Sequence, residues 1–164
     1  MPEDRGLTVV SDTSPLLYLH RVGQLDLLRR LYGRIFVPEQ VGDEIKAGGA
    51  DGPDIRSLSW IQPRTIGVPT MLRMVPDLGP GEAGAIALAL ETGPHSLLLL
   101  DDRLARRIAI RHNVPMTGTA GVLLKAKQMG FISSVRSLIE ELIASGFYLR
   151  PDHTQMLFRI AGET

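Results

Sequence analysis

Cysteine is absent from the 164 residues, and its absence excludes several kinds of chemistry at once. Disulfides, thiolate zinc sites and cysteine nucleophiles are ruled out, so any metal must be held by oxygen or imidazole ligands. Long apolar runs are lacking too, since none approaches the roughly 20 residues that a helix needs to cross a bilayer. There is also no basic leader followed by a short apolar segment and a cleavage site. We therefore expect a cytoplasmic protein without a membrane segment.

The chain also has no net charge, with 18 Lys and Arg residues against 18 Asp and Glu residues. A balanced chain does not coat nucleic acid by bulk electrostatics, so such contact would need a local basic patch. One patch lies between Asp101 and Gly130, where basic residues outnumber two acids; they are Arg103, Arg106, Arg107, Arg111, Lys125 and Lys127. Within this patch, the stripe of Arg103, Arg107 and Arg111 is typical of an exposed helix face, and contact with phosphate groups is the alternative interpretation.

Apolar residues make up 44% of the sequence, enough to bury a core, and the length suits one domain over residues 1–164. Strands are expected at residues 7–10, 34–37, near 60–61, 96–100 and 114–117. Helices are expected after Ser14 as N-cap, around 25–33, from 38, and at 81–92, 102–112, 120–129, 134–145 and 152–160. This alternation predicts an α/β domain with a mainly parallel central sheet.

Acidic residues stand where these elements would bring them to one edge of that sheet. Asp12 and the pair Asp101-Asp102 directly follow strands, and Glu82 lies in the first turn of a helix. Because parallel strands end at the same edge and the following helices begin there, these side chains should share a pocket. Glu44 lies about six residues into its helix, or roughly 9 Å of rise, and remains near that edge.

Such a cluster predicts a bound cation. Two carboxylates about 4 Å apart repel by about 4 kcal/mol at an effective dielectric constant of about 20, so four of them need compensation. Glu82 is the most informative member, because it shares a helix face with the apolar residues Ile86, Ala89 and Leu90. Oxygen ligands that leave room for water and phosphate favour Mg²⁺ or Mn²⁺.

Each acid taken alone has a simpler explanation. Asp12 and Asp102 could cap turns or helices, Glu82 could complement a helix dipole, and Glu44 could be solvated. An aspartyl-phosphate protein of the haloacid-dehalogenase type is excluded by detail, because it needs Asp-x-Asp after the first strand and Asp12 is followed by Thr13-Ser14. The joint placement of the acids is therefore what favours a functional site.

Five short motifs, in this order, resemble PIN-domain proteins of the VapC-like kind. They are Asp12-Thr13-Ser14-Pro15, Val37-Pro38 leading to Glu44-Ile45, the run from Gly81 to Ala89, Asp101-Asp102 followed by Arg106, and the run from Val114 to Thr119. Each motif is weakly specific, but five in the same order make a strong combined signal. The resemblance covers about residues 7–130, and the helices at 134–160 would complete or extend the domain.

The resemblance implies a three-layer α/β/α PIN-like fold and a metal-dependent ribonuclease that hydrolyses RNA phosphodiester bonds. It implies catalytic acids at Asp12, Glu44, Glu82, Asp101 and Asp102, with Asp12, Glu82 and one or both of Asp101 and Asp102 as ligands of Mg²⁺ or Mn²⁺. Thr13, Ser14 and Thr117 match hydroxyl positions that bind water or orient an acid, and RNA contact is expected at Arg103, Arg106 and Arg107. Glu82 departs from the aspartate more usual in the VapC branch.

The resemblance also implies partners. Many such proteins are toxins held in check by an antitoxin protein encoded beside them, and many form homodimers. The apolar stripe of the helix at 134–145 is the surface expected to support self-association, although such a stripe is more often part of a core than a partner surface. A non-catalytic PIN-like module that keeps its carboxylates and serves in binding remains the alternative function.

Overall fold

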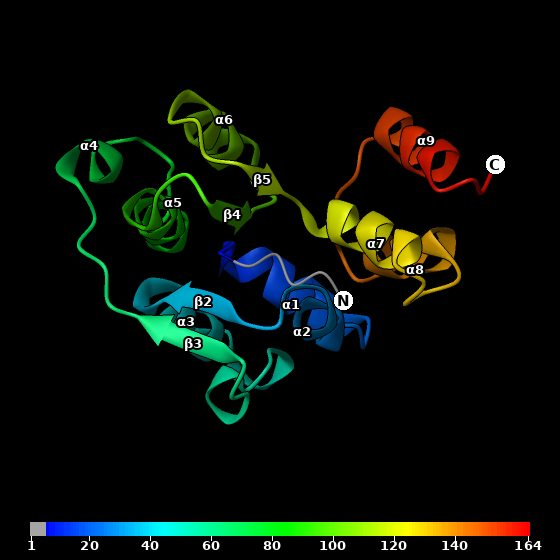
Figure 1. Ribbon diagram of the computed structural model, residues 1–164, viewed down its shortest axis with the longest axis horizontal. Coiled ribbons are helices and arrows are strands. Elements are labelled where there is room, and N and C mark those ends of the chain that lie inside the picture. Colours follow the sequence, from blue (N-terminus) through cyan, green and yellow to red (C-terminus); the bar gives the residue numbers. More distant parts are fainter. Residues whose placement is uncertain (1–5) are drawn as a thin grey trace.

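The computed structural model describes residues 6–164 and contains a five-stranded sheet between two layers of helices (Figure 1). The strand order is β3-β2-β1-β4-β5, and every pair of neighbouring strands is parallel. The strands are β1 (Thr8–Ser11), β2 (Ile35–Pro38), β3 (Ile61–Arg64), β4 (Ser96–Leu99) and β5 (Met116–Thr117). This confirms the three-layer α/β/α fold with a parallel sheet. Residues 1–5 of the expected domain lie outside the described residues.

Side chains alternate between the two faces of the sheet, and each face has its own layer of helices. Val9 and Leu99 face a core covered by α1 (Thr13–Arg21), α2 (Asp26–Tyr32), α3 (Glu39–Ala47), α7 (Thr119–Gln128), α8 (Val135–Ala144) and α9 (Pro151–Ile160). Val10 and Leu98 face a second core covered by α4 (Thr70–Arg73), α5 (Pro80–Thr92) and α6 (Arg103–Arg111). Two 3₁₀ turns, η1 (Gly49–Asp51) and η2 (Ile55–Ser57), lie between α3 and β3. No helix within residues 6–164 combines the length and the apolar character needed to cross a membrane.

The strand order creates a crevice beside β1. The chain leaves β1 toward β2 and β3 on one side and returns to β4 and β5 on the other. Ser11 of β1 pairs with Leu99 of β4, and the backbone N–H of Asp12 donates to the carbonyl of Leu99 at 3.0 Å. Asp12 and Asp101 therefore emerge side by side where the strand order reverses, which is where open parallel sheets usually bind ligands.

Two local predictions need correction. Asp12, not Ser14, is the N-cap of α1, and the hydroxyl of Ser14 donates to Asp101. Leu90 does not share a buried stripe with Glu82; it is 37% exposed, since α5 is buried on nearly every side over its earlier turns and emerges only at its end. The strand expected near residues 60–61 is confirmed as the edge strand β3, and the segment after it also supplies the buried side chain of Leu72.

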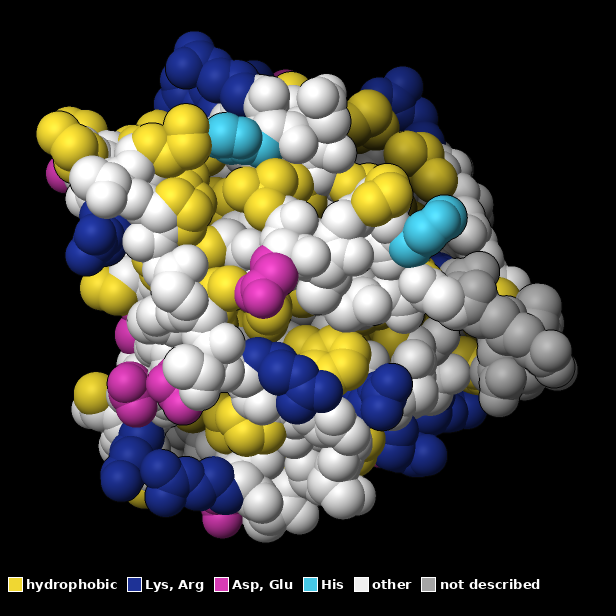
Figure 2. Space-filling model, turned by 60° about the vertical axis from the view of Figure 1, so that its left-hand side comes forward, with side chains coloured by type: hydrophobic (Ala, Val, Ile, Leu, Met, Phe, Trp, Pro, Cys, Tyr) yellow, Lys and Arg dark blue, Asp and Glu magenta, His cyan; other side chains and the backbone are white. Residues whose placement is uncertain are grey.

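Exposed hydrophobic side chains do not lie where self-association was expected. The stripe of α8, formed by Val135, Leu138, Ile139 and Leu142, is buried against the chain itself, and only Ile143 is exposed. Figure 2 brings forward the side of the molecule that carries α4 and α5, and hydrophobic side chains spread over the upper half of that face. Met74, just after α4, is 75% exposed. The described residues thus offer more exposed apolar surface near α4 than on α8.

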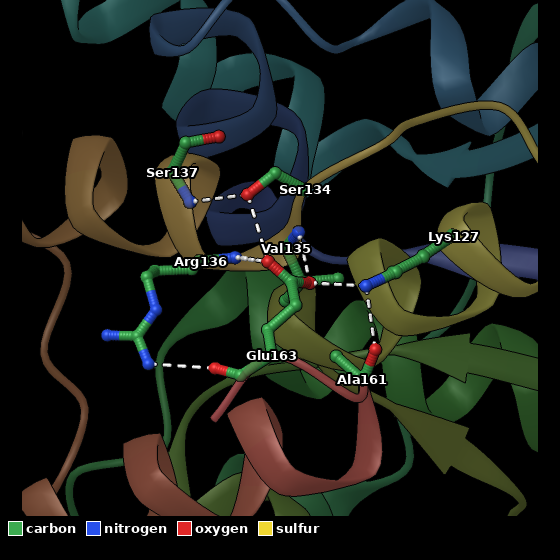
Figure 3. A network of polar contacts seen from close by, with 7 residues as sticks. All are labelled: Lys127, Ser134, Val135, Arg136, Ser137, Ala161 and Glu163. Carbon is green, nitrogen blue, oxygen red and sulfur yellow. Dashed lines mark hydrogen bonds and ion pairs between the residues drawn. The ribbon is translucent and has the colours of Figure 1, made fainter.

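The C-terminal end of the chain is fixed by Glu163 (Figure 3). Its carboxylate accepts hydrogen bonds from the hydroxyl of Ser134 and from two backbone N–H groups at the start of α8. Lys127 of α7 pairs with the same carboxylate at 2.8 Å and donates to the carbonyl of Ala161 at 2.6 Å. Lys127, followed by these N–H groups, lowers the pKa of Glu163 to about 2. Glu163 thereby joins the end of α9 to α7 and α8.

We expect Glu163→Gln to lower the free energy of unfolding by about 1–3 kcal/mol at neutral pH, because charge-assisted hydrogen bonds become neutral ones. The folded-state pKa is below the usual 4.5, so this contribution is complete above pH 4.5 and is lost as the pH falls toward 2. Urea unfolding at about pH 7 and about pH 3 measures the difference between the two proteins. Glu140→Gln, an exposed acid on α8, is the control and should change little at either pH. A Glu163→Gln deficit that does not shrink in acid would contradict this role.

Candidate active site

A cavity of about 760 Å³ opens at the crevice beside β1. Four of the five predicted acids line it, namely Asp12, Glu82, Asp101 and Asp102. Glu44 is absent from its lining, and so is Thr13, whereas Ser14 and Thr117 contribute to it. Elements far apart in the sequence therefore meet here, as the strand order requires.

Asp12 is the most deeply buried of these acids, with 4% of its surface exposed. Its Oδ1 atom is one of only two buried side-chain oxygens within residues 6–164 that have no hydrogen-bond partner. The pKa of Asp12 is raised to about 7, mainly by burial and also by the charges of Glu82, Glu44 and Asp101, against the lowering effect of a backbone N–H. The acids thus influence one another electrostatically. Because a buried oxygen of Asp12 has no hydrogen-bond donor, a cation would stabilise this carboxylate most.

Glu44 connects three helices instead of lining the cavity. One carboxylate oxygen accepts a hydrogen bond from the hydroxyl of Thr13 on α1 at 2.6 Å, and the other accepts from the backbone N–H of Gly81 on α5 at 2.8 Å. A Cβ atom at position 81 would lie 2.5 Å from Glu44 Oε2, so only glycine allows this close approach. Glu44 therefore positions the helix starts that carry Asp12 and Glu82.

Asp101 connects β4 to α1 and α7 in a similar way. Its Oδ2 accepts hydrogen bonds from the hydroxyls of Ser14 at 3.0 Å and Thr119 at 2.6 Å, and its Oδ1 accepts from the Thr119 backbone N–H at 2.8 Å. Sequence analysis named Thr117 and missed Thr119. The available signal was its place as the first residue of a helix that follows a strand, which is also the place of Thr13.

Glu82 and Asp102 both act as helix caps. Glu82 accepts a hydrogen bond from the backbone N–H of Gly79 at 2.9 Å, and Asp102 accepts from that of Ala105 at 2.9 Å. Capping does not describe Glu82 completely, because a helix start favours the charged form of a carboxyl group. The pKa of Glu82 is instead raised, first by burial and then by the charges of Asp102 and Glu44. The capping hydrogen bond therefore keeps the carboxylate of Glu82 close to other negative charges that repel it.

The three arginines predicted to bind RNA lie on α6, but they do not all line the cavity. Arg103 and Arg106 line the cavity, and Arg106 also donates to the carbonyl of Leu100 at 3.0 Å. Arg107 is exposed but is not part of the lining. Residues 146–150 and the first turns of α9 form a further wall of the same cavity. This wall was not predicted from the sequence.

The chemistry of this donor set fits a hydrated divalent ion. No three or more acidic or histidine side chains in the described part of the chain are arranged to hold a metal by themselves. Glu44, Glu82, Asp101 and Asp102 each accept a hydrogen bond at a helix start, whereas the buried Asp12 Oδ1 has no partner. Mg²⁺ keeps several waters and commonly takes only one or two carboxylates, and Mn²⁺ prefers the same oxygen ligands. Asp12 Oδ1 is thus the buried oxygen for which such an ion could supply the missing partner.

A family model for the PIN domain matches residues 8–163. The match extends beyond the resemblance noted at residues 7–130 and includes α8 and α9. PIN domains are usually nucleases, a class of hydrolase, and they generally use divalent metal ions. No curated protein matches the sequence.

We expect Glu82→Gln to leave the metal-free protein as stable as wild type or more so, because it removes repulsion but keeps an acceptor for Gly79. Mg²⁺ or Mn²⁺ at about 100 times its Kd should stabilise the wild type by about 2.7 kcal/mol and this variant clearly less. Thermal unfolding in EDTA and in added metal measures both effects. Glu91→Gln, an exposed change on the same helix, should behave like wild type. A Glu82→Gln protein that is weaker in EDTA yet gains as much from metal would remove Glu82 from the site.

Proposed function

The chain belongs to the PIN-domain family, and on this basis we propose that residues 1–164 form a single PIN-like domain that hydrolyses RNA phosphodiester bonds with Mg²⁺ or Mn²⁺. The observation that carries the proposal is the buried Asp12, which has a carboxylate oxygen without a hydrogen-bond partner and lines a cavity together with Glu82, Asp101 and Asp102. Such an arrangement costs stability and is typical of catalytic sites. A structural role alone would not require it.

Each residue has a distinct part in the proposed reaction. Asp12, with Glu82 and one or both of Asp101 and Asp102, would hold the ion. The positive charge of the ion would activate water and stabilise the leaving oxygen of the RNA. Glu44, through its hydrogen bonds to Thr13 and to the start of α5, would hold the starts of α1 and α5 in place. Ser14 and Thr119 fix the orientation of Asp101. Arg103 and Arg106 bring positive charge to a cavity that would otherwise repel a phosphate group.

The biological setting is proposed from the VapC-like resemblance. We propose a cytoplasmic toxin component whose activity is blocked by a cognate antitoxin protein. A small open reading frame beside the gene, encoding a DNA-binding protein, would support this assignment.

A non-catalytic binding module is the second candidate. It is favoured by one observation, namely that no three acidic or histidine side chains in residues 6–164 are placed to hold a metal unaided. In that case the cavity would bind its partner without cutting it, and EDTA would not affect the protein.

Cleavage of RNA separates these functions. Wild type should cut single-stranded RNA in Mg²⁺ or Mn²⁺ and stop in EDTA, and Asp12→Asn should be slower by about 100-fold or more. Asp43→Asn, an exposed change on α3 outside the cavity, should keep full activity when purified identically. DNA of the same sequence tests whether the sugar matters. Equal cleavage by wild type and Asp12→Asn would assign the activity to a contaminant and favour the binding module.

Homodimer formation remains a proposal drawn from the family resemblance. Sedimentation at high micromolar concentration should give a dimer mass for wild type. Met74→Lys tests the exposed apolar surface near α4, and Ile143→Lys tests the originally expected α8, since each places a charge at an exposed apolar position. Dissociation by one variant identifies the interface. A strictly monomeric wild type would contradict the proposal.

A further inference from the structure

The cavity has a wall that the proposed chemistry leaves unused. It is formed by the segment between α8 and α9 and by the first turns of α9, including Tyr148, Arg150 and His153. Tyr148 is 78% exposed, the largest fraction among the exposed large hydrophobic side chains of the described residues. An aromatic ring left in water beside a charged cavity is a common feature of surfaces that bind single-stranded nucleic acid.

This wall is fixed to α1, the helix that begins at Asp12. Phe147, next to Tyr148, is buried, and its ring packs edge-on against Tyr18 of α1 with centroids 5.0 Å apart. The hydroxyl of Tyr18 donates to the carbonyl of Gly146 at 3.4 Å, and Arg21 donates to that of Ser145. Because α1 also begins at Asp12, the position of Tyr148 is set relative to the acids through a single helix.

The other side of the wall is held by α9. Phe158 of α9 is buried in the core and lies beneath the guanidinium of Arg136, 4.0 Å from its ring centroid. The contacts of Glu163 with α7 and α8 fix the end of the same helix (Figure 3). The exposed ring of Tyr148 is thus carried by a segment with supports at both ends, which keeps the cost of ordering it on binding small.

We propose that Tyr148 is a positioning residue that stacks on an unpaired base of the RNA and places the neighbouring phosphate over the acids. The inference rests on the proposed function. Arg103 and Arg106 supply positive charge for the backbone at the same cavity. Arg150 contributes less, because it is paired with Asp152 at 3.0 Å. Bases in a duplex already stack on one another, so only a single strand offers a free face to the ring.

Binding in EDTA tests the proposal without cleavage. Wild type, Tyr148→Ala and Tyr148→Phe are titrated with a single-stranded RNA oligonucleotide and with its duplex. Tyr148→Ala should raise the Kd for the single strand by about 5- to 100-fold, Tyr148→Phe should keep it within about 2-fold, and the duplex should not distinguish them. Met129→Ala, an exposed change outside the cavity, is the control. Arg103→Ala should also lower the salt dependence of binding by about one phosphate, and Arg107→Ala should not.

Activity in Mg²⁺ provides the second readout. The KM of Tyr148→Ala should rise by about the same factor as its Kd while kcat stays within a few fold, since the acids are untouched. A wild type that cleaves RNA, combined with a Tyr148→Ala variant that binds and cleaves equally well, would overturn this inference alone and favour a protein partner for the wall. A wild type that binds the single strand through Tyr148 but never cleaves it would support the stacking role and overturn the proposed reaction. A wild type that neither binds nor cleaves RNA would overturn both.

Discussion

Compensation of negative charge at the carboxyl edge of the sheet is the constraint on which the structure depends. Five acids approach this edge, and Glu44, Glu82, Asp101 and Asp102 each accept a hydrogen bond from a donor at the start of a helix. Gly81 donates to Glu44, Gly79 to Glu82, and Thr119 to Asp101. The helices must therefore begin at these residues, because the donors are backbone groups left free only in a first turn. Asp12 is left with an oxygen that no donor reaches.

The fold could be predicted from the sequence because its signals are local. Apolar runs such as 96–100 mark strands, and Gly or Pro marks most helix boundaries, so the observed elements agree with the expected ones to within a few residues. The gathering of Asp12, Glu82, Asp101 and Asp102 followed from one rule about parallel strands. Leu90 was misplaced because a helix covered on nearly all sides has no single stripe that a period can reveal.

Details that depend on tertiary contacts could not be read from the sequence. Glu44 was expected to face the pocket, but its length lets it reach back to Thr13 and Gly81, and only the packing of α3 against α5 reveals this. The apolar stripe of α8 gave no indication of whether its partner is the same chain or a second one; in the structure it packs within the chain. Tyr148 lies in a segment without periodicity. Nothing in the sequence therefore connected it with the cavity at Asp12, which stands some 130 residues earlier.

The two walls of the cavity come from separate parts of the sequence. The acids belong to residues 12–102, whereas the wall with the exposed Tyr148 belongs to residues 146–157 and contacts α1 through Tyr18 and Arg21. Selection can therefore act on the later segment with little effect on the earlier one. Related chains that differ there would inherit the same reaction and acquire different targets, so divergence of this short segment is a route by which one ancestral enzyme could give rise to many specificities.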